Sequence, residues 1–398
     1  MPTLLLVIAA SLSQLLARFD TAAARKDFPE AERLAQEAVH RFPESREAHL
    51  ALARVYLWTG RYEQARVEFG RLTQRNAEDA EAHLGSAQTE YWSGDYRNAL
   101  RKFQRVLELR PGEPTALRSL EEIRSAMRPG YTSAVEAGTD NQPLRGLGGA
   151  ASVYWFGDPL TKVTATVRRH HLEGKTLERD VTSAAAVADS MLPQLKLRAA
   201  GGITVVRYPD GHSDVAPYAT LSRSGLSISV ERRPLVQSER GLRTHPSAEV
   251  LGLQFRRGWG GWESLLDAEH LRYFDHNRGI RLDGYVLSPS IRHVRWGLSA
   301  SYRDTRDSRF DGAAYDPYHT PQSLVEGRAV VSWERGRIGI HLDGGRGRDR
   351  IAGTFNPWRL RARAAIPMGA AILALEGERA VTAFYRADAF RASVAGRF

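Results

Sequence analysis

Arginine recurs at alternate positions in several segments of the C-terminal two thirds of the chain. The clearest case is residues 358–366, where Arg359, Arg361 and Arg363 alternate with apolar side chains. Alternate positions of a strand share one face, and a guanidinium group binds carboxylate, sulfate or phosphate in a bidentate way. These segments therefore predict a face that attracts anions. The residues with this placement are Arg168, Arg198, Arg295, Arg303, Arg359, Arg361, Arg363, Arg391 and Arg397.

Composition limits the other chemistry of this protein. The 398 residues include no cysteine, which excludes disulfides and thiol catalysis, and we expect neither a metal nor a cofactor. The formal net charge is +10, of which residues 1–129 contribute +1 and residues 130–398 contribute +9. The arginines are spread over many segments instead of clustering with lysine and serine. We therefore expect no nucleic-acid partner.

A period of two dominates residues 130–398 and predicts strands with one apolar face. We expect about sixteen strands of roughly 9–15 residues, long enough to cross a bilayer when tilted. Short turns alternate with longer loops, which favours an outer-membrane β-barrel over a soluble sandwich. The charge of this region is then expected to turn inward, because an arginine that faces lipid at the midplane costs roughly 2–4 kcal/mol. The longer loops lie near residues 170–178, 207–214, 232–247, 272–279, 304–321 and 344–354.

The last residues of the chain alternate in the same way, with Phe390, Val394 and Phe398 on one face. This pattern resembles the terminal strand of bacterial outer-membrane barrels. The resemblance implies recognition by the barrel-assembly machinery and insertion among outer-membrane lipids. An even number of strands places both ends of the barrel on one side of the membrane. We therefore expect residues 12–128 to lie in the periplasm.

Residues 12–128 show a repeat of 34 residues. It relates Gly60, Tyr62, Ala65 and Phe69 to Gly94, Tyr96, Ala99 and Phe103, and Pro111 ends a repeat. The spacing resembles the tetratricopeptide repeat, a pair of helices in which small residues allow close packing and aromatic residues fill the gap. The named residues are expected to serve packing, and the stack to present a concave surface to a partner. The predicted repeats are 12–45, 46–79 and 80–113, with a closing helix up to residue 128.

The first 11 residues include an apolar stretch, Leu4–Ala10, followed by small residues. Such a stretch is typical of an export signal, although the usual basic residue before it is missing. We expect an export signal at residues 1–11. The alternatives are a misassigned start and the buried edge of the first helix.

Tetratricopeptide repeats placed before an outer-membrane barrel resemble the export porins of bacterial exopolysaccharide systems. Examples are the poly-N-acetylglucosamine export porin, the C subunit of the cellulose synthase operon and the smaller YaiO-type proteins. The segment from Ala314 to Tyr318 looks like a Tyr-x-x-Pro stretch of those barrels. The resemblance implies an α+β multidomain protein, with a helical repeat domain followed by a barrel at residues 130–398.

Export of a polysaccharide is the function that this resemblance implies, an anionic one if the lumenal arginines bind it. Tyr315 and Tyr318 would stack on sugar rings, and the periplasmic repeats would dock synthesis or modification proteins. The chain has about three repeats where the large exporters carry many more. With fewer repeats, the repeat domain is expected to reach a shorter distance across the periplasm.

Three alternatives stay open at this stage. The barrel can be plugged and serve as the anchor of a periplasmic scaffold. A lipid-modifying enzyme would need Ser or Asp beside His170, His171 or His270, and adjacent histidines point to opposite faces of a strand, so we expect no enzyme. The arginines can also pair with acids that fill the lumen. Candidate acids are Glu231, Glu263, Asp267 and Glu269.

Overall fold

The computed structural model describes residues 2–140, 145–176, 178–235, 239–309, 318–382 and 385–398. The chain divides into a helical unit and a barrel unit, with the boundary between residues 127 and 128. No described helix is both long enough and apolar enough to cross a membrane. The helical unit contains seven helices within the described residues. They are α1 (Pro2–Ala24), α2 (Phe28–Arg41), α3 (Arg46–Trp58), α4 (Tyr62–Arg75), α5 (Ala80–Ser93), α6 (Tyr96–Leu109) and α7 (Pro114–Ala126).

Local capping sets where these helices begin and end. The carboxylates of Asp27, Asp79 and Asp95 each accept a hydrogen bond from the backbone N–H three residues later, which satisfies a free donor of the first turn. Gly60 and Gly94 follow α3 and α5 with φ values of 74° and 84°, a region that L side chains rarely adopt. The turns after α3 and α5, 34 residues apart, therefore have the same backbone geometry.

The core of the helical unit contains the residues that recur in the sequence. Ala65 and Ala99 are fully buried, and Phe69 and Phe103 are almost fully buried. A Cβ atom on Gly85 of α5 would lie 2.2 Å from the Phe69 ring, so α4 and α5 approach each other more closely than an alanine would allow. The alanine and phenylalanine pairs thus lie in the core, where the sequence places packing residues.

The helix pairs α3–α4 and α5–α6 fall within the predicted repeats 46–79 and 80–113, whereas α1 begins at Pro2, ten residues before the predicted first repeat. Helix α7 lies where the closing helix is expected. Tyr62 and Tyr96 are partly buried at the starts of α4 and α6, and Pro111 lies in the turn after α6. Residues 2–10, where we expect an export signal, continue α1 as a helix. Helical structure is common to a signal segment and to an ordinary first helix, so the export signal stays a prediction.

A buried ion cluster links α4, α5 and α6. Glu90 is 3% exposed and accepts hydrogen bonds from Arg66 at 2.6 Å and from Lys102 at 2.6 Å. Burial by itself raises the pKa of the Glu90 carboxyl, but the bonds from Arg66 and Lys102 outweigh it and the net shift is downward. Glu90 is therefore ionised at neutral pH and connects three helices.

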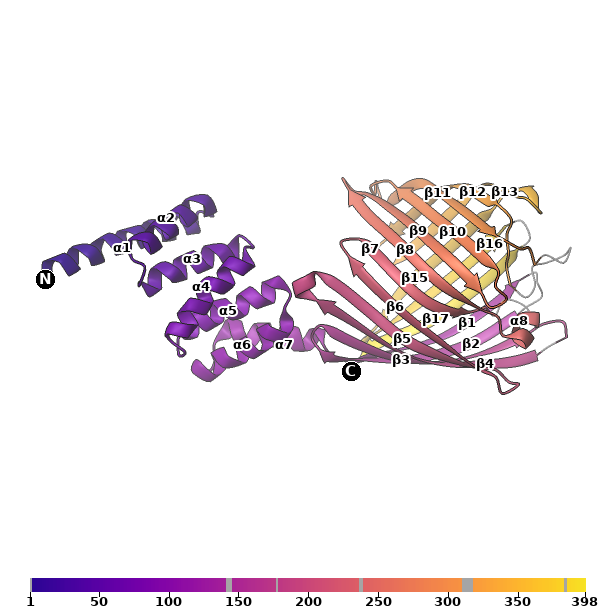
Figure 1. Cartoon of the computed structure of the whole chain (residues 1–398), viewed down its shortest axis with the longest axis horizontal. Helices are drawn as coiled ribbons and strands as arrows, with labels where there is room; N and C mark the ends of the chain where they lie inside the picture. The colour runs from indigo at the N-terminus through magenta and orange to yellow at the C-terminus, as the bar shows by residue number, and fades with distance from the viewer. Residues whose placement is uncertain (1, 141–144, 177, 236–238, 310–317, 383–384) are drawn as a thin grey trace. The chain divides into compact units, whose positions relative to one another are not determined.

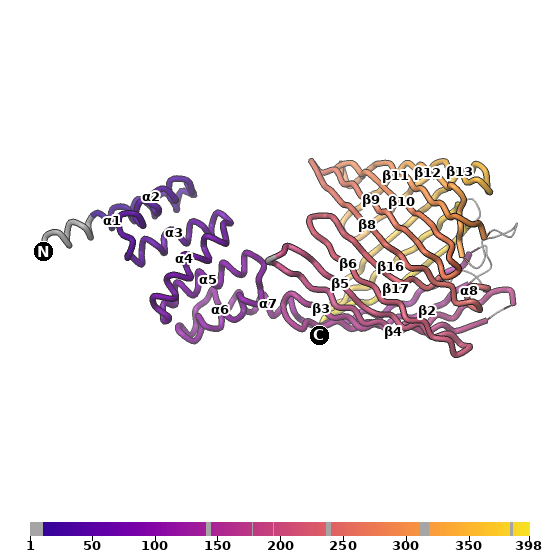
Figure 2. Tube along the Cα trace, in the orientation of Figure 1, coloured from indigo at the N-terminus to yellow at the C-terminus, as the bar shows by residue number. Residues whose placement is uncertain are grey.

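The barrel unit is a single antiparallel sheet in which consecutive strands are neighbours (Figures 1 and 2). β1 pairs with β17 from Gly130↔Arg397 to Asp140↔Ala387, which closes the barrel. Because β14 and β15 both pair with β13, the sheet has 16 strand positions, which confirms the predicted fold class. The strands are β1 (Gly130–Asp140), β2 (Arg145–Asp158), β3 (Thr161–Glu173), β4 (Glu178–Leu192), β5 (Leu197–Arg207), β6 (Ser213–Arg223), β7 (Leu226–Pro234), β8 (Ser247–Trp259), β9 (Trp262–Tyr273), β10 (Arg278–Leu287), β11 (Val294–Thr305), β12 (Leu324–Arg335), β13 (Ile338–Asp349), β14 (Gly353–Phe355), β15 (Trp358–Met368), β16 (Ala371–Val381) and β17 (Arg386–Arg397).

The connections differ between the two ends of the barrel. The start of β1 and the end of β17 lie at the end that carries short turns, such as those before β3, β7, β9, β13 and β16. The two longest connections, residues 235–246 and 306–323, leave the other end, where the short helix α8 (Glu239–Thr244) also lies (Figure 1). We refer to these as the short-turn end and the loop end.

Candidate functional site

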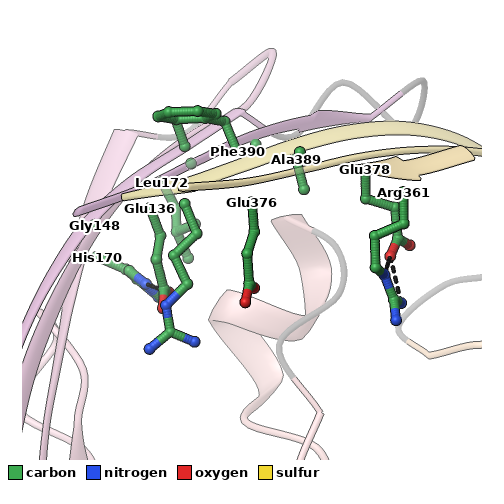
Figure 3. Close-up of a pocket in the computed structure, with 14 residues that line it drawn as sticks. Glu136, Gly148, His170, Leu172, Arg361, Glu376, Glu378, Ala389 and Phe390 are labelled. Atoms are coloured by element: carbon green, nitrogen blue, oxygen red, sulfur yellow. Dashed lines mark hydrogen bonds and ion pairs between the residues drawn. The ribbon is translucent and has the colours of Figure 1, made fainter. Parts of the chain in front are cut away.

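Exposure distinguishes the two faces of the barrel wall. Large apolar side chains in the middle of the strands, such as Val167, Leu266, Leu298 and Leu360, are about half exposed, and the charged residues occupy the alternate positions. Since only the outer face of a barrel offers a continuous apolar surface, these apolar residues face outward and the alternate ones face the lumen. Figure 3 shows this directly, with Glu136, Glu376 and Glu378 on one side of the sheet and Phe390 on the other.

All nine predicted arginines lie on the lumenal positions of their strands. Seven of them have a carboxylate partner among the described residues, so the alternative of pairing with lumenal acids describes most of the set. Arg168 has none there, and Arg397 lies at the end of β17. The pairs are Arg198–Asp189, Arg295–Glu263 at 3.1 Å, Arg303–Asp283 at 3.7 Å, Arg359–Asp343 at 3.5 Å, Arg361–Glu378 at 2.5 Å, Arg363–Glu334 at 2.7 Å and Arg391–Glu136 at 3.5 Å.

A cavity of about 490 Å³ lies along one side of the lumen, over β1–β3 and β15–β17 (Figure 3). Three carboxylates, Glu136, Glu376 and Glu378, project into it together with Arg361 and Arg391. Glycine and alanine occupy many intervening positions on this wall, which leaves the charged groups accessible. Both signs of charge are therefore available to a polar chain inside the cavity.

His170 of β3 contributes a titratable group to the same cavity. Its Nε2 atom lies 3.2 Å from a carboxylate oxygen of Glu136. The ring lies over Gly148 of β2, where an added Cβ would come within 1.7 Å of it. Only glycine at position 148 leaves enough space for the imidazole of His170 to lie beside Glu136.

The lumen is packed along β12 and β13, which adjoin β15, and at the loop end. Glu326, Arg328 and Asp343 have side chains that are 10% exposed or less, and Arg328 pairs with both acids, at 2.8 Å to Asp343. At the loop end, Leu235 and Tyr318 from the two long connections join an apolar cluster with Val250, Leu271 and Tyr273 of the inner wall. The open cavity is therefore displaced to one side of the barrel.

Tyr318 does not present a free ring to a sugar in this structure. It is 1% exposed, and its ring stacks on Tyr273 with 4.3 Å between centroids. Its hydroxyl group donates to Asp275 at 2.8 Å. Burial by itself raises the pKa of Asp275, but this bond and the bonds from Asn277 and Arg309 outweigh it and lower the pKa. Tyr318 anchors its connection to the wall, and Tyr315 lies outside the described residues.

The net charge of the barrel is not turned inward, which differs from the expectation from the sequence. Basic and acidic residues occupy the lumenal strand positions in nearly equal numbers. The excess of basic residues lies on the outward positions, close to the strand ends. The outward basic residues are Arg145, Arg169, Arg207, Arg223, Arg232, Arg257, Arg272, Arg278, Arg335, Arg346, Arg348, Arg379 and Arg386, and the outward acids are Glu173, Glu178, Asp180, Glu249, Asp304 and Asp388.

The candidate enzyme histidines have carboxylates as neighbours. His170 faces the lumen beside Glu136, whereas His171 faces outward and lies 3.1 Å from Asp180. His270 also faces outward, on β9. The described residues contain no group of three His, Cys, Asp or Glu side chains that could hold a metal ion.

Phe390 and Val394 lie on the outward face of β17, as expected for lipid-facing positions. Phe398 is 71% exposed, and its ring centroid lies 5.4 Å from that of Tyr131. Its backbone N–H donates to the carbonyl of Pro129 at 3.0 Å, so the end of the last strand meets the start of the first.

Comparisons with known proteins find similarities for both parts of the chain. A family profile described as "Tetratricopeptide repeat" matches residues 22–89. No curated protein matches the sequence. The structure described as "Bacterial polysaccharide outer membrane secretin" is similar with a TM-score of 0.52 and 11% identity, covering 69% of this chain and 99% of that chain.

Two further solved structures are similar to one part each. CdiB from Acinetobacter baumannii has a TM-score of 0.46 and 10% identity, covering 67% of this chain and 60% of that chain. The tetratricopeptide domain of Arabidopsis OM64 has a TM-score of 0.28 and 17% identity, covering 29% of this chain and 96% of that chain. Identities this low concern the fold alone. The protein combines tetratricopeptide repeats with a closed 16-strand barrel of the outer-membrane type.

Proposed function

We propose that this protein is an outer-membrane porin that exports an exopolysaccharide, with the tetratricopeptide repeats in the periplasm. The observation that carries the proposal is the cavity beside β1–β3 and β15–β17, lined by Arg361, Arg391, Glu136, Glu376 and Glu378. Hydroxyl groups of a sugar both donate and accept hydrogen bonds, and such a wall offers partners for both. A barrel of this size can enclose a water-filled path.

The substrate class follows from the pairing of the lumenal charges. Arginines that already contact carboxylates attract an anionic chain less strongly than free ones, since each pair is nearly neutral at a distance. Within the described strands Arg168, Arg179 and Arg256 are lumenal arginines without such a partner, and Arg361 is half exposed. We propose a neutral or weakly anionic polysaccharide, with the strongly anionic one as the alternative outcome.

The repeats are proposed to dock proteins that synthesise or modify the polysaccharide. Two tryptophans at the same repeat position, Trp58 and Trp92, are 47% and 64% exposed at the ends of α3 and α5. Exposed tryptophan is enriched where proteins bind each other. The barrel-assembly machinery is proposed to insert the barrel through the outward Phe390 and Val394 of β17 and through Phe398, which directly follows β17.

A planar-bilayer measurement on the purified full-length chain tests the proposal. We expect discrete single-channel currents that are reduced by a neutral polysaccharide added on one side. The alternative is a plugged barrel that anchors a periplasmic scaffold, and it is favoured by the packed wall around Arg328 and Tyr318. Deletion of residues 12–128 distinguishes the pore from the scaffold. A pore should conduct with or without these residues, whereas a plugged barrel should not conduct in either form. A closed wild-type barrel contradicts the export proposal.

A further inference from the structure

The outer face of the barrel carries its charges only near the strand ends. Each outward charged residue lies within four positions of a strand end, and the middle of every strand is uncharged on this face. The short-turn end has three outward arginines, Arg223, Arg257 and Arg335. The loop end has ten outward arginines and six acids.

One group of arginines at the loop end lies on neighbouring strands. It consists of Arg278 at the start of β10, Arg306 after β11, Arg346 and Arg348 near the end of β13, and Arg350 directly after β13. We call these five residues the β10–β13 arginine cluster. All five side chains are exposed, and none has an ion-pair partner among the residues that the structure describes.

The register of the strands keeps the cluster together. The backbone N–H of Arg306 donates to the carbonyl of Arg278 at 2.9 Å, so these two residues are neighbours. Arg348 lies opposite Val325, which lies opposite Tyr302. Because barrel strands are tilted by roughly 35–45°, the end of β13 and the start of β10 reach a similar height.

A single acid accompanies the cluster on the outward strand positions of β10–β13. Asp304 accepts a hydrogen bond from the backbone N–H of Ser323 at 2.9 Å and one from the hydroxyl of Tyr302 at 3.4 Å. Both of its oxygen atoms are therefore engaged with neighbours other than arginine. Within the described residues no carboxylate forms an ion pair with an arginine of the cluster, so the guanidinium groups can bind an external anion.

Directly below the cluster the wall is apolar. Ile280, Val325 and Leu342 are 49%, 52% and 50% exposed on the outward face of β10, β12 and β13. The cluster therefore lies at the boundary between the hydrocarbon layer and the polar surface of the membrane. Lipid headgroups occupy this depth, and a phosphate there can accept bidentate hydrogen bonds from guanidinium groups.

We propose that the β10–β13 arginine cluster binds the phosphates of a glycolipid headgroup in the leaflet at the loop end. The occupant has at least two phosphates, because five neighbouring cations are neutralised better by two anions than by one. The proposal rests on the proposed function in one respect, the orientation that places the loop end in the outer leaflet. The proposal goes beyond the export function because it assigns a lipid-binding site to the outer face of the barrel.

Native mass spectrometry of the full-length protein in a neutral detergent tests this inference. The probe is diphosphoryl lipid A, with monophosphoryl lipid A, phosphatidylcholine and inorganic phosphate as comparisons. The variant is R278Q/R346Q/R348Q. The matched control is R223Q/R257Q/R335Q, which removes the same charge from equally exposed outward positions at the short-turn end.

Wild-type protein and the short-turn control are expected to bind diphosphoryl lipid A alike, and the cluster variant roughly tenfold or more weakly. Monophosphoryl lipid A should bind less tightly than the diphosphoryl form. Equal binding by the cluster variant and the wild type overturns the inference, as does an equal loss in the short-turn control. Displacement of lipid A by inorganic phosphate at equal concentration also overturns it, because the site would then take free phosphate.

A second variant, R278K/R346K/R348K, keeps the charge and removes the planar fork, so it should bind with intermediate affinity. Mobility in unheated and heated gels verifies that each variant forms a folded barrel. Conductance separates this inference from the proposed function. The cluster variant should conduct as the wild type does, because these arginines face away from the lumen. A wild-type barrel without conductance refutes the pore and leaves the lipid measurement valid.

Discussion

Arg361 of β15 and Glu378 of β16 lie directly opposite each other in the register of the two strands, with Nε of the arginine 2.8 Å from Oε2 of the glutamate. The same pair of strands places Arg363 opposite Glu376. Opposite charges at facing positions stabilise adjacent strands, and here Arg361, Glu376 and Glu378 also line the open cavity. The charge of this wall therefore depends on both members of each pair.

Removing one member of the Arg361–Glu378 pair should change ion selectivity. In E378Q the Arg361 guanidinium loses its counter-charge, so the reversal potential in a KCl gradient should move towards that of chloride. R361Q should move it in the opposite direction. R379Q is the control, because Arg379 lies on β16 next to Glu378 and faces outward. A conducting pore whose selectivity is the same in all three variants contradicts this assignment of the cavity.

The close contact of α4 with α5 predicts opposite effects for two glycine substitutions. G85A should destabilise the helical unit by about 1–3 kcal/mol, because the new Cβ overlaps the Phe69 ring. G70A should stabilise it by roughly 0.5–1 kcal/mol, because no atom lies within 4 Å of its Cβ position and alanine favours a helix. Denaturant unfolding followed by helical circular dichroism measures both. A stabilising G85A variant would show that the helices are farther apart than described.

Glu90 should make the stability of the helical unit depend on pH. Its folded-state pKa lies below its unfolded-state value of about 4.3, so its contribution is present above that pH and is lost as the pH falls through the folded-state pKa. E90Q should lower stability by about 1–3 kcal/mol at pH 7, and the difference from wild type should shrink below about pH 4.

The control for E90Q is E63Q. Glu63 pairs with the same Arg66 at 2.7 Å, but its side chain is 89% exposed. Exposed pairs contribute little, so E63Q should change stability by less than about 0.5 kcal/mol at any pH. Hydrogen exchange of α5 and α6 between pH 3 and pH 7 gives the measurement. Equal effects of the two variants would mean that burial of Glu90 is not the source of its contribution.

Tyr318 should hold the long connection at residues 306–323 against the inner wall. Y318F removes the hydroxyl that donates to Asp275, at a cost of about 1 kcal/mol, and should make this connection more accessible to an added protease. Y302F is the control, because Tyr302 faces outward on β11 and its 3.4 Å bond to Asp304 is weaker. Cleavage rates that are equal in Y318F and wild type would show that stacking on Tyr273 is sufficient.

Most of the fold could be predicted because its patterns are local. The 34-residue period places small and aromatic residues of one repeat in register with the next, and Ala65, Ala99, Phe69 and Phe103 are buried as expected. The period of two assigns each strand residue to a face without knowledge of its neighbours. By this alternation the nine predicted arginines occupy lumenal strand positions.

The lumenal pairing could not be predicted, since it depends on which strands meet and in which register. Arg363 contacts Glu334, a residue 29 positions away on a strand that does not adjoin its own, and no local pattern links the two. The role of Tyr318 depends equally on contacts with Asp275 and Tyr273, which approach only after the connection folds back onto the wall.

The sequence by itself determined the helical repeat and the closed barrel, because periodicity is a property of neighbouring residues. Only the tertiary structure decided how the charge of +9 in residues 130–398 is distributed. Lumenal arginines are balanced by acids of other strands, since a charge in an enclosed space needs a nearby partner. The unbalanced arginines lie on the outer face at the strand ends, where water and lipid headgroups can solvate them.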